Sequence, residues 1–570
     1  MKAKREPKAH PADSIAVIDF ETDPFSHGIV PKPFCAGLAW THKEKRYYRA
    51  FWGDDCAAQV AQFIYDRLKK PRMIYAHNGG KFDFLFLRDW IDNTDEKTGV
   101  RMIGARMVEC KLGIHTMRDS FAILPVALKA SGEKKEIDYT KMHRDCRDTH
   151  RAEILEYLEA DCFALLNLTR AFAVKFSGER SRRIPMTIGS AAEKALRSTL
   201  SHFDCPRLTP SQDAELRRFY FGGRVQCFET GAILTPLKSF DVNSMYPGVM
   251  RNYAHPNGRM VAIEGGALDQ ASKSLMRNGT LGPKWAGKER VFFVRFTGWA
   301  RHMPLRRDDG KTVYEGTGEY FACSHEIEMC FETGNIRIDK VQEIIVSSDT
   351  VNFSEFVDKF YSERLEAKAA GNVEETLFLK LVLNSAYGRF AINPERFRDT
   401  YITHGEMPPG EGWRKEKTVQ GEMGITVVWR RTPEPEEIEK QYKNVAVAAS
   451  ITSAARAELA RGIMAADRVV YCDTDSITCA DFRGEIDPNT VGAWKYEGDY
   501  SEFHIAGKKT YAGRLAGTDQ WKTACKGAVL TAPEIVRVAA GETITYKREA
   551  PTFSWLREAK FVVRQITATA

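Results

Sequence analysis

One short acidic stretch constrains the fold more than any other part of the sequence. Asp473 and Asp475 lie two residues apart between the apolar runs 469–472 and 477–478. This pattern predicts a β-hairpin with both carboxylates at its tip. Residues two apart on an extended chain face the same side, so the two carboxylates can bind one hard divalent cation such as Mg²⁺. The alternative is a simple turn that closes a hairpin, because Asp is common in turns.

Length and composition exclude several classes of protein. At 570 residues with 43% apolar residues, the chain should form several globular domains. A formal net charge of +7 suits a polyanionic partner such as DNA. No window of 18 apolar residues is present and the basic first ten residues lead into no apolar segment, so we expect a cytoplasmic protein without membrane contact. The 12 cysteines have no zinc-type spacing and are expected to be reduced.

Hydrophobic patterns predict a few strong elements in the first part of the chain. Residues 14–20 and 73–77 are apolar runs that end in polar residues, which favours buried strands. From 151 to 176 apolar residues recur at helical spacing, so a long amphipathic helix should close the first domain near residue 180.

In the second part of the chain, residues 377–387 form a strongly helical stretch that we expect to stop at Gly388. Between 400 and 440 the composition changes to Pro, Gly and charged residues around a short β-like run at 424–429. This region is therefore predicted to be an inserted arm or loop outside the core.

A first group of acids lies before residue 162. Asp19 and Glu21 are two apart at the end of a predicted strand, and Asp83 follows a second strand. Tyr157 and Asp161 are four apart on the predicted helix and so share one side of it. Four converging carboxylates would hold two divalent ions about 4 Å apart for phosphodiester hydrolysis, with Tyr157 orienting the attacking water. The alternative is that each acid is a solvated surface group.

A second group of candidate residues surrounds the predicted hairpin. Asp241 ends a predicted strand and is the natural partner of Asp475 in holding two metal ions, assisted by the Val242 carbonyl. Asp473 would assist at a primer end. Tyr246 follows in the same turn, where its ring could stack beneath an incoming sugar and exclude a 2′ hydroxyl; ordinary core packing is its alternative.

A polar stripe marks the predicted helix before Gly388. Lys380, Asn384 and Tyr387 lie at positions i, i+4 and i+7, which places a cation, an amide and an aromatic ring on one face. Lys380 could bind nucleotide phosphates while Tyr387 packs on a base pair. Arg364, earlier in the chain, is expected to be a second phosphate contact.

These motifs together resemble those of family B DNA polymerases. The patterns D-x-E at Asp19, N-x-x-x-F-D at Asn78 and Y-x-x-x-D at Tyr157 are similar to the three motifs of the family's proofreading exonuclease. The patterns D-x-x-S-x-Y-P at Asp241, K-x-x-x-N-S-x-Y-G at Lys380 and Y-x-D-T-D-S at Tyr471 resemble polymerase motifs A, B and C, in the family's order. The resemblance implies a mixed α/β and α+β chain, with a ribonuclease H-like exonuclease domain and a right-hand polymerase of palm, fingers and thumb.

The resemblance also implies further contacts and cofactors. Lys134 lies where the family keeps a lysine beside the scissile phosphate. Expected DNA-binding residues are Tyr220, Gly222 and Gly223 of a Y-x-G-G motif, Lys509 and Tyr511 of a K-x-Y motif, and Thr22, His77, Asn78, Phe86, Ser120, Phe121 and Thr474. Each active site should use two Mg²⁺ ions, for which Mn²⁺ is expected to substitute. The substrates are dNTPs.

Two long intervals indicate the protein-primed branch of small linear-genome phages, since they resemble its two insertions. The expected parts are an exonuclease domain at 1–182, palm at 183–252 and 446–529, an insertion for terminal protein at 253–350, fingers at 351–391, an insertion for strand displacement and processivity at 392–445, and a thumb at 530–570. Expected partners are template and primer DNA, a terminal protein as primer and a single-stranded-DNA-binding protein, with the polymerase itself a monomer. Two alternatives are an RNA- or DNA-primed repair polymerase and a DNA-binding scaffold with decayed sites; the intact acids argue against the scaffold.

Overall fold

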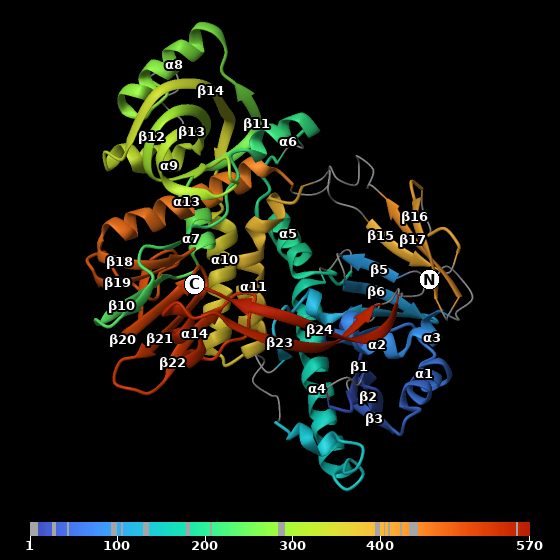
Figure 1. Ribbon diagram of the computed structural model, residues 1–570. Helices are drawn as coiled ribbons and strands as arrows, with labels where there is room; N and C mark the ends of the chain where they lie inside the picture. Colours follow the sequence, from blue (N-terminus) through green and yellow to red (C-terminus); the bar gives the residue numbers. More distant parts are fainter. Residues whose placement is uncertain are drawn as a thin grey trace.

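The computed structural model describes residues 10–24, 30–42, 45–92, 100–103, 106–128, 136–177, 183–205, 208–282, 291–393, 399–403, 405–408, 411–421, 424–431, 443–554 and 557–570. These residues form an N-terminal domain, a central domain with a four-stranded unit on one side, and a C-terminal hairpin (Figure 1). No described helix is long and apolar enough to span a membrane. All 12 cysteines are free thiols, as expected.

The N-terminal domain is built on a mixed sheet. Its own strands have the order β5-β6-β7-β4-β1-β2-β3, in which β1 pairs in parallel with β4 and β4 with β7. The strands are β1 (Ile15–Thr22), β2 (Pro33–His42), β3 (Lys45–Trp52), β4 (Met73–Ala76), β5 (Val100–Ile103), β6 (Arg106–Leu112) and β7 (His115–Asp119). The helices are α1 (Cys56–Arg67), α2 (Asp83–Phe86), α3 (Arg88–Asp92) and α4 (Arg151–Phe176). The predictions for β1, β4 and α4 are confirmed.

Alternation along β1 decides which face its acids occupy. Ile15 and Val17 belong to the core that contains α4, whereas Ala16 and Ile18 belong to the core that contains α1. Successive strand residues face opposite sides, so the odd-numbered acids Asp19 and Glu21 lie on the α4 face. On the same face, a Cβ at Gly37 of β2 would lie 2.8 Å from Cys162 Sγ of α4, so glycine at this position allows the helix to approach the sheet closely.

The central domain contains the second sheet, with the order β22-β21-β20-β10-β19-β18-β8 and β9 paired to β20. Its strands are β8 (Val225–Cys227), β9 (Gly231–Ile233), β10 (Leu237–Val242), β18 (Ala466–Asp473), β19 (Ser476–Phe482), β20 (Trp494–Gly507), β21 (Thr510–Leu515) and β22 (Trp521–Cys525). Its helices are α5 (Ile188–Thr199), α6 (Pro210–Arg217), α7 (Met245–Asn252), α10 (Ser354–Ala369), α11 (Val373–Phe390), α13 (Val445–Met464) and α14 (Ala532–Ala539). The antiparallel pairs β10–β19 and β18–β19 bring the two acidic strand ends together.

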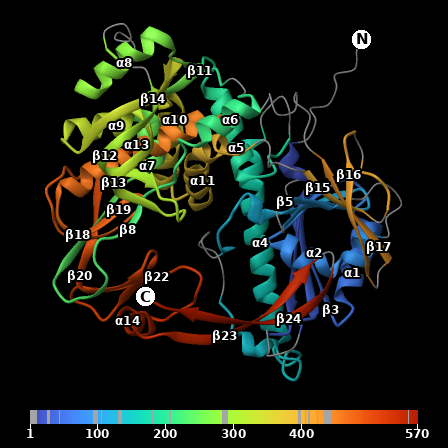
Figure 2. The same cartoon turned by 45° about the horizontal axis from the view of Figure 1, so that its top comes forward.

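The first predicted insertion forms a compact unit. Its sheet has the order β11-β14-β12-β13, made of β11 (His255–Ala262), β12 (Phe292–Arg306), β13 (Thr312–Cys323) and β14 (Ile336–Val351). The helices α8 (Gly265–Asn278) and α9 (Ser324–Glu332) pack against it, and α9 also contacts α13 of the central domain. Figure 2 shows this unit stacked on the side of the central domain that carries α13.

The prediction that residues 400–440 form an arm or loop outside the core is wrong for the described residues up to 431, while 432–440 lie outside the described part of the chain. Strands β15 (Asp399–Thr403), β16 (Arg414–Gly421) and β17 (Gly424–Arg431) continue the N-terminal sheet, because β15 pairs with β5 through Ile402 and Val100. Ile402, Val427 and Val428 are buried. The β-like run at 424–429 is confirmed as β17, and the free edge of β5 explains why it joins a distant sheet.

The predicted helix stop at Gly388 is also wrong, because α11 continues to Phe390. Arg389 forms an ion pair with Glu193 of α5, and Phe390 packs against Phe203 and Phe353. These tertiary contacts outweigh the weak helix propensity of one glycine. After α14, β23 (Ile544–Ser554) and β24 (Arg557–Ala568) form a hairpin that extends toward the N-terminal domain (Figures 1 and 2).

Candidate active sites

The acidic hairpin tip is present as predicted, with Thr474 and Asp475 as its two turn residues. Thr474 has φ 61°, a left-handed conformation that a β-branched residue adopts rarely. Two hydrogen bonds hold it: the Thr474 amide donates to the Arg224 carbonyl (2.7 Å), and the Val242 amide donates to the Asp475 carbonyl (2.7 Å). The turn is therefore fastened to β10 on one side and to the segment before β8 on the other.

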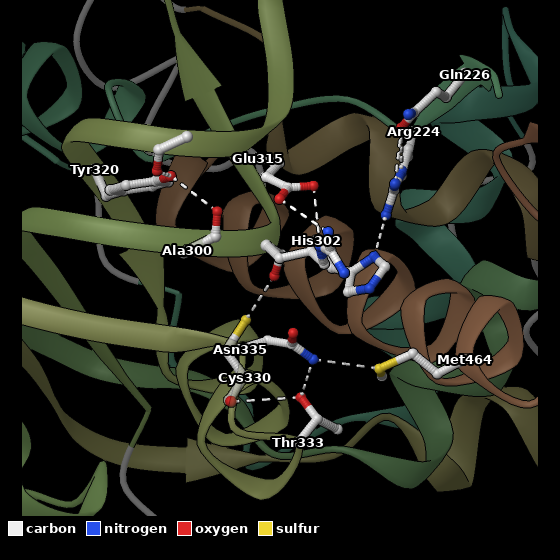
Figure 3. Close-up of polar contacts among 12 residues, drawn as sticks. Arg224, Gln226, Ala300, His302, Glu315, Tyr320, Cys330, Thr333, Asn335 and Met464 are labelled. Carbon is white, nitrogen blue, oxygen red and sulfur yellow. Dashed lines mark hydrogen bonds and ion pairs between the residues drawn. The ribbon is translucent and has the colours of Figure 1, made fainter.

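Arg224 connects this tip to the four-stranded unit (Figure 3). Its guanidinium is buried, lies 3.0 Å from His302 Nδ1 and donates to Gln226 Oε1. Burial and the neighbouring Arg224 charge lower the pKa of His302 to about 4, so the imidazole is neutral at pH 7 and can accept this bond. Arg224 and His302 were missed at the level of sequence, because no local pattern relates positions 78 residues apart.

Asp241 and Asp475 form the electrostatic centre of the site. Burial, followed by the charge of Asp241, raises the pKa of Asp475 to about 6. Burial also raises the pKa of Asp241, which Lys495 partly opposes. Both oxygens of Asp473 instead lie 2.7 Å from Lys509 Nζ. Two partly buried carboxylates that repel each other fit a divalent cation, whereas Asp473 already has a counter-charge.

Within the described part of the chain, no three Asp, Glu, His or Cys side chains meet closely enough to enclose a metal ion by themselves. Mg²⁺ usually retains several waters and binds through one or two carboxylates together with substrate phosphates. A pair such as Asp241 and Asp475, with the Val242 carbonyl beside it, matches that open donor set.

The predicted nucleotide-binding residues lie on two helices beside these acids. The Tyr246 ring of α7 stacks on the Tyr387 ring of α11, with centroids 3.9 Å apart and an interplanar angle of 18°. Lys380 and Asn384 are exposed on α11, while Leu379 and Leu383 are buried in the core. Lys380 and Asn384 therefore face away from the core, whereas Tyr387 packs against it. Arg364 lies on α10 near the Tyr361 ring.

The Y-x-G-G and K-x-Y segments meet at one cavity of about 320 Å³. Its lining is rich in lysines and aromatic rings, and consists of Phe221, Gly222, Gly223, Val225, Thr312, Tyr314, Lys508, Lys509 and Lys526. A Cβ at Gly223 would come within 2.8 Å of the Thr474 side chain, whereas one at Gly222 would meet nothing within 4 Å. Gly223 is therefore needed for close packing on the hairpin turn. The close neighbour is the Thr474 side chain, whereas the sequence motif predicts a DNA contact at this glycine.

A buried ion pair stabilises the backbone of the Y-x-G-G segment. Arg456 of α13 and Glu326 of α9 are each 1% exposed and lie 2.8 Å apart. The same guanidinium donates to the carbonyls of Phe221 and Gly222. The carbonyl of Tyr220 accepts from Arg306 of β12. Tyr511 stacks on Phe503, and the Tyr471 hydroxyl accepts from the Lys509 amide.

The four acids of the N-terminal domain come from three elements: Asp19 and Glu21 from β1, Asp83 from α2 and Asp161 from α4. The Phe20 amide donates to Asp83 Oδ1 (3.2 Å), and burial followed by the charge of Asp19 raises the pKa of Asp83. On the helix side, burial raises the pKa of Tyr157, and the Asp161 and Glu21 charges raise it further. The Tyr157 hydroxyl lies 3.3 Å from that of Tyr139. Electrostatic interactions therefore connect Asp83 with Asp19, and Tyr157 with Asp161 and Glu21; a metal site made of the four carboxylates stays a prediction.

Several predicted DNA contacts gather beside these acids. Asn78 Oδ1 accepts from Arg106, which also pairs with Asp119 and lies over the Phe121 ring. His77 Nδ1 lies 3.0 Å from Ser120 Oγ. Arg106 and Asp119 were missed at the level of sequence, where nothing in their local context distinguishes them.

Two other predicted contacts occupy the edges of this region. Phe86 packs against Phe20 and Phe82 instead of joining the Asn78 cluster, and Thr22 ends β1. Lys134 lies outside the described residues.

The comparisons with known proteins agree with the motif assignment. The family model of DNA polymerases of type B, organellar and viral, matches residues 129–468. The chain is 37% identical to the DNA-directed DNA polymerase of Enterobacteria phage PRD1, over 97% of this chain and 98% of the relative. It is 26% identical to the DNA polymerase of Bacillus phage phi29, over 78% of each chain.

The fold is similar to solved structures of phi29 DNA polymerase. The structure with primer-template DNA and incoming nucleotide has a TM-score of 0.68 and 19% identity, covering 97% of this chain and 99% of that chain. The structure with single-stranded DNA has a TM-score of 0.69 and 18% identity. At this level of identity the likeness concerns the fold, and it confirms the predicted multidomain α/β architecture of an exonuclease domain with palm, fingers and thumb.

Proposed function

This chain belongs to the type B DNA polymerases of organelles and viruses, in their protein-primed branch, and we propose that it synthesises and proofreads DNA at two separate acid sites. The observation that carries this proposal is the juxtaposition of Asp241 with Asp475, whose pKa is raised by burial and then by the charge of Asp241, as a cation between the two carboxylates would relieve. The second site consists of Asp19, Glu21, Asp83 and Asp161.

At the polymerase site, Asp241, Asp475 and the Val242 carbonyl would hold two Mg²⁺ ions. Bound there, the ions would lower the pKa of a primer 3′ hydroxyl and neutralise charge on the triphosphate and pyrophosphate. Lys380 extends from α11 as a point charge for the phosphates. The stacked Tyr246 and Tyr387 rings form a flat support for the incoming nucleotide and leave little room for a 2′ hydroxyl.

The primer terminus would be held beside the Asp473 carboxylate. Lys509 binds that carboxylate and borders the cavity that also contains Lys508 and Lys526. A strand of phosphates would supply the counter-charge for these lysines. The stacked Tyr511 and Phe503 rings join β21 to β20 beside the turn that carries Lys509.

At the exonuclease site, the four carboxylates would hold metal for hydrolysis of a terminal phosphodiester, with Tyr157 orienting the water. Asn78 and Phe121 are held together by Arg106, so an amide and an aromatic ring are presented to the same strand. Base stacking on such a ring is independent of sequence, which suits an enzyme that must remove any mispaired nucleotide.

Two substitutions test the separation of the sites. Folded Asp475→Asn should not extend a primer with Mg²⁺ and dNTPs, whereas Asp481→Asn, an exposed acid on the strand β19 that follows the turn, should extend normally. Asp19→Ala combined with Glu21→Ala should keep extension and lose degradation of a single-stranded 3′ end. Extension by Asp475→Asn, or degradation by the double variant, would refute the assignment.

We further infer that synthesis starts on the hydroxyl of a terminal protein that docks on the unit from 253 to 350. The position of this unit supports the inference. Its helix α9 packs on α13, and the Arg456–Glu326 ion pair that holds the Y-x-G-G segment joins these same two helices. The test supplies a labelled dNTP and a candidate terminal protein from the same genome. A labelled nucleotide joined to that protein is the expected product, and its absence from an otherwise active polymerase would favour an RNA- or DNA-primed enzyme.

The strands β15–β17 are proposed to assist strand displacement, and a single-stranded-DNA-binding protein in the host cytoplasm would cover the displaced strand. Support comes from the sheet that joins this arm to the N-terminal domain, which holds it rigidly. Replacing β16 and β17 by a short linker should stop extension through a downstream duplex while copying of single-stranded template continues. Displacement by the shortened protein would contradict this role.

A further inference from the structure

A lysine occupies the approach to the polymerase acids. Lys495 on β20 pairs in register with Asp241 on β10, so the two side chains are neighbours across the sheet. Lys495 Nζ lies 3.3 Å from Asp241 Oδ1 and 2.6 Å from Glu497 Oε1. Lys495 and Glu497 are two apart on one strand and therefore face the same side.

The ammonium of Lys495 is thus shared between two acids with different surroundings. Asp241 is partly buried and pairs in register with Ser476, the residue after Asp475, and its charge raises the pKa of Asp475. Glu497 stands farther along β20, with Lys522 of β22 lying 3.9 Å from its second oxygen. A short movement about the Lys495 side-chain bonds would take its charge from Asp241 to Glu497 alone.

Resting on the proposed function, we propose that Lys495 is a resident counter-ion of the polymerase metal site, which a divalent cation must displace from Asp241. The contact oxygen of Asp241 cannot serve an ammonium and a metal ion at the same distance, because the two cations repel each other. Glu497 receives the displaced ammonium. Lys495 therefore sets the metal concentration at which Asp241 and Asp475 are filled, and it neutralises Asp241 while no metal is bound.

Substitutions of Lys495 and of Glu497 should change the metal affinity of the site in opposite directions. Lys495→Met removes the competitor and should lower the Kd of the site for Mn²⁺ about five-fold, the equivalent of about 1 kcal/mol for a half-exposed ion pair. Glu497→Gln removes the alternative position of the ammonium and should raise the Kd. A role in folding alone would not move metal affinity in both directions.

The measurement is Mn²⁺ titration followed by the electron paramagnetic resonance signal of the free ion. It uses the full chain carrying Asp19→Ala and Glu21→Ala, so that the exonuclease acids do not contribute, and it requires no turnover. Lys238→Met is the matched control, because Lys238 lies on β10 but pairs with the exposed Asp481. Its Kd should equal that of the parent protein.

A double variant separates this role from direct ligation by Glu497. In Lys495→Met, the further change Glu497→Gln should leave the Kd unaltered, since Glu497 acts through Lys495. A further rise would show that Glu497 holds the metal itself and would overturn the proposal. A Kd for Mn²⁺ that stays unchanged or rises in Lys495→Met would also overturn the proposal. Lys495→Gln, which keeps a polar side chain, serves in place of the Met variant should that protein not fold.

Failure of this proposal is distinguishable from failure of the proposed function. Primer extension by the parent protein together with its loss in Asp475→Asn tests the site itself. Extension that behaves as expected, combined with unchanged Mn²⁺ affinity in the Lys495 variants, removes only the counter-ion role.

Discussion

Replacing Asp475 by Asn should stabilise the metal-free protein while abolishing polymerisation. The carboxylate stands in a partly buried position beside Asp241, where a negative charge is unfavourable without a cation. Asn has nearly the same shape and no charge. The substitution therefore removes the electrostatic cost and the metal-binding function together.

The magnitude follows from the pKa of Asp475, which burial and Asp241 raise from 3.8 to about 6. At about 1.4 kcal/mol per pKa unit, the ionised side chain lowers the free energy of unfolding by about 3 kcal/mol. Because the folded-state pKa is the higher one, this cost is absent below pH ~4, grows between pH ~4 and ~6, and is complete above. The gain in Asp475→Asn should be about 3 kcal/mol at pH 8 and about 1.6 kcal/mol at pH 5.

The assay is urea unfolding in EDTA at both pH values, followed by circular dichroism. Asp481→Asn is the control, on the strand β19 that follows the turn: Lys238 lowers the pKa of Asp481, so this variant should gain no stability at pH 8. In a background that carries Asp19→Ala and Glu21→Ala, saturating Mn²⁺ should stabilise the protein that keeps Asp475 and leave Asp475→Asn nearly unchanged, since only the former keeps the polymerase site. No gain at pH 8, or a larger gain at pH 5 than at pH 8, would refute the reasoning.

Three further predictions concern the supports of the two sites. Glu326→Gln should lower the free energy of unfolding by about 3–5 kcal/mol in the urea assay, because Arg456 is left charged and buried. Glu315→Gln, in the exposed pair with Arg301, should lower it by less than about 1 kcal/mol. Tyr246→Ala should raise the kcat/KM for ribonucleotides relative to deoxyribonucleotides, and Tyr246→Phe, which keeps the stacked ring, should not. Arg106→Met should slow degradation of a single-stranded 3′ end roughly ten-fold by releasing Asn78 and Phe121, with extension unchanged. The first expectation would be contradicted by an equal loss of unfolding free energy in the two Glu variants. The second would be contradicted by unchanged discrimination against ribonucleotides in Tyr246→Ala, and the third by undiminished degradation in Arg106→Met.

Local sequence patterns were sufficient for the elements whose contacts are close along the chain. The helix from Arg151 to Phe176 follows directly from its apolar spacing, and the hairpin around Asp473 follows from two apolar runs that flank a turn. The spacing of two placed Asp19 and Glu21 on one face of β1 before any tertiary contact was known.

Long-range contacts decided the points where sequence patterns were misleading. Gly388 does not end α11, because Arg389 and Phe390 find partners in α5 and near α10. Residues 399–431 join a sheet whose other strands lie some 300 residues earlier, because β5 offers a free edge. Neither the end of α11 nor the position of these strands can be predicted from neighbouring residues, since the stabilising partners are distant in sequence.

The sequence by itself determined which acids are present, their order and their pairwise spacing, because these depend only on the covalent chain and the strand and helix periods. The tertiary structure alone decided which charge meets which: Lys509 on Asp473, Lys495 between Asp241 and Glu497, Arg106 between Asn78 and Asp119. Electrostatic interactions depend on distance in space and on burial, and neither is set until the strands are paired. The acids of the two proposed sites were therefore predictable from sequence, while their ion pairs with neighbouring cations were not.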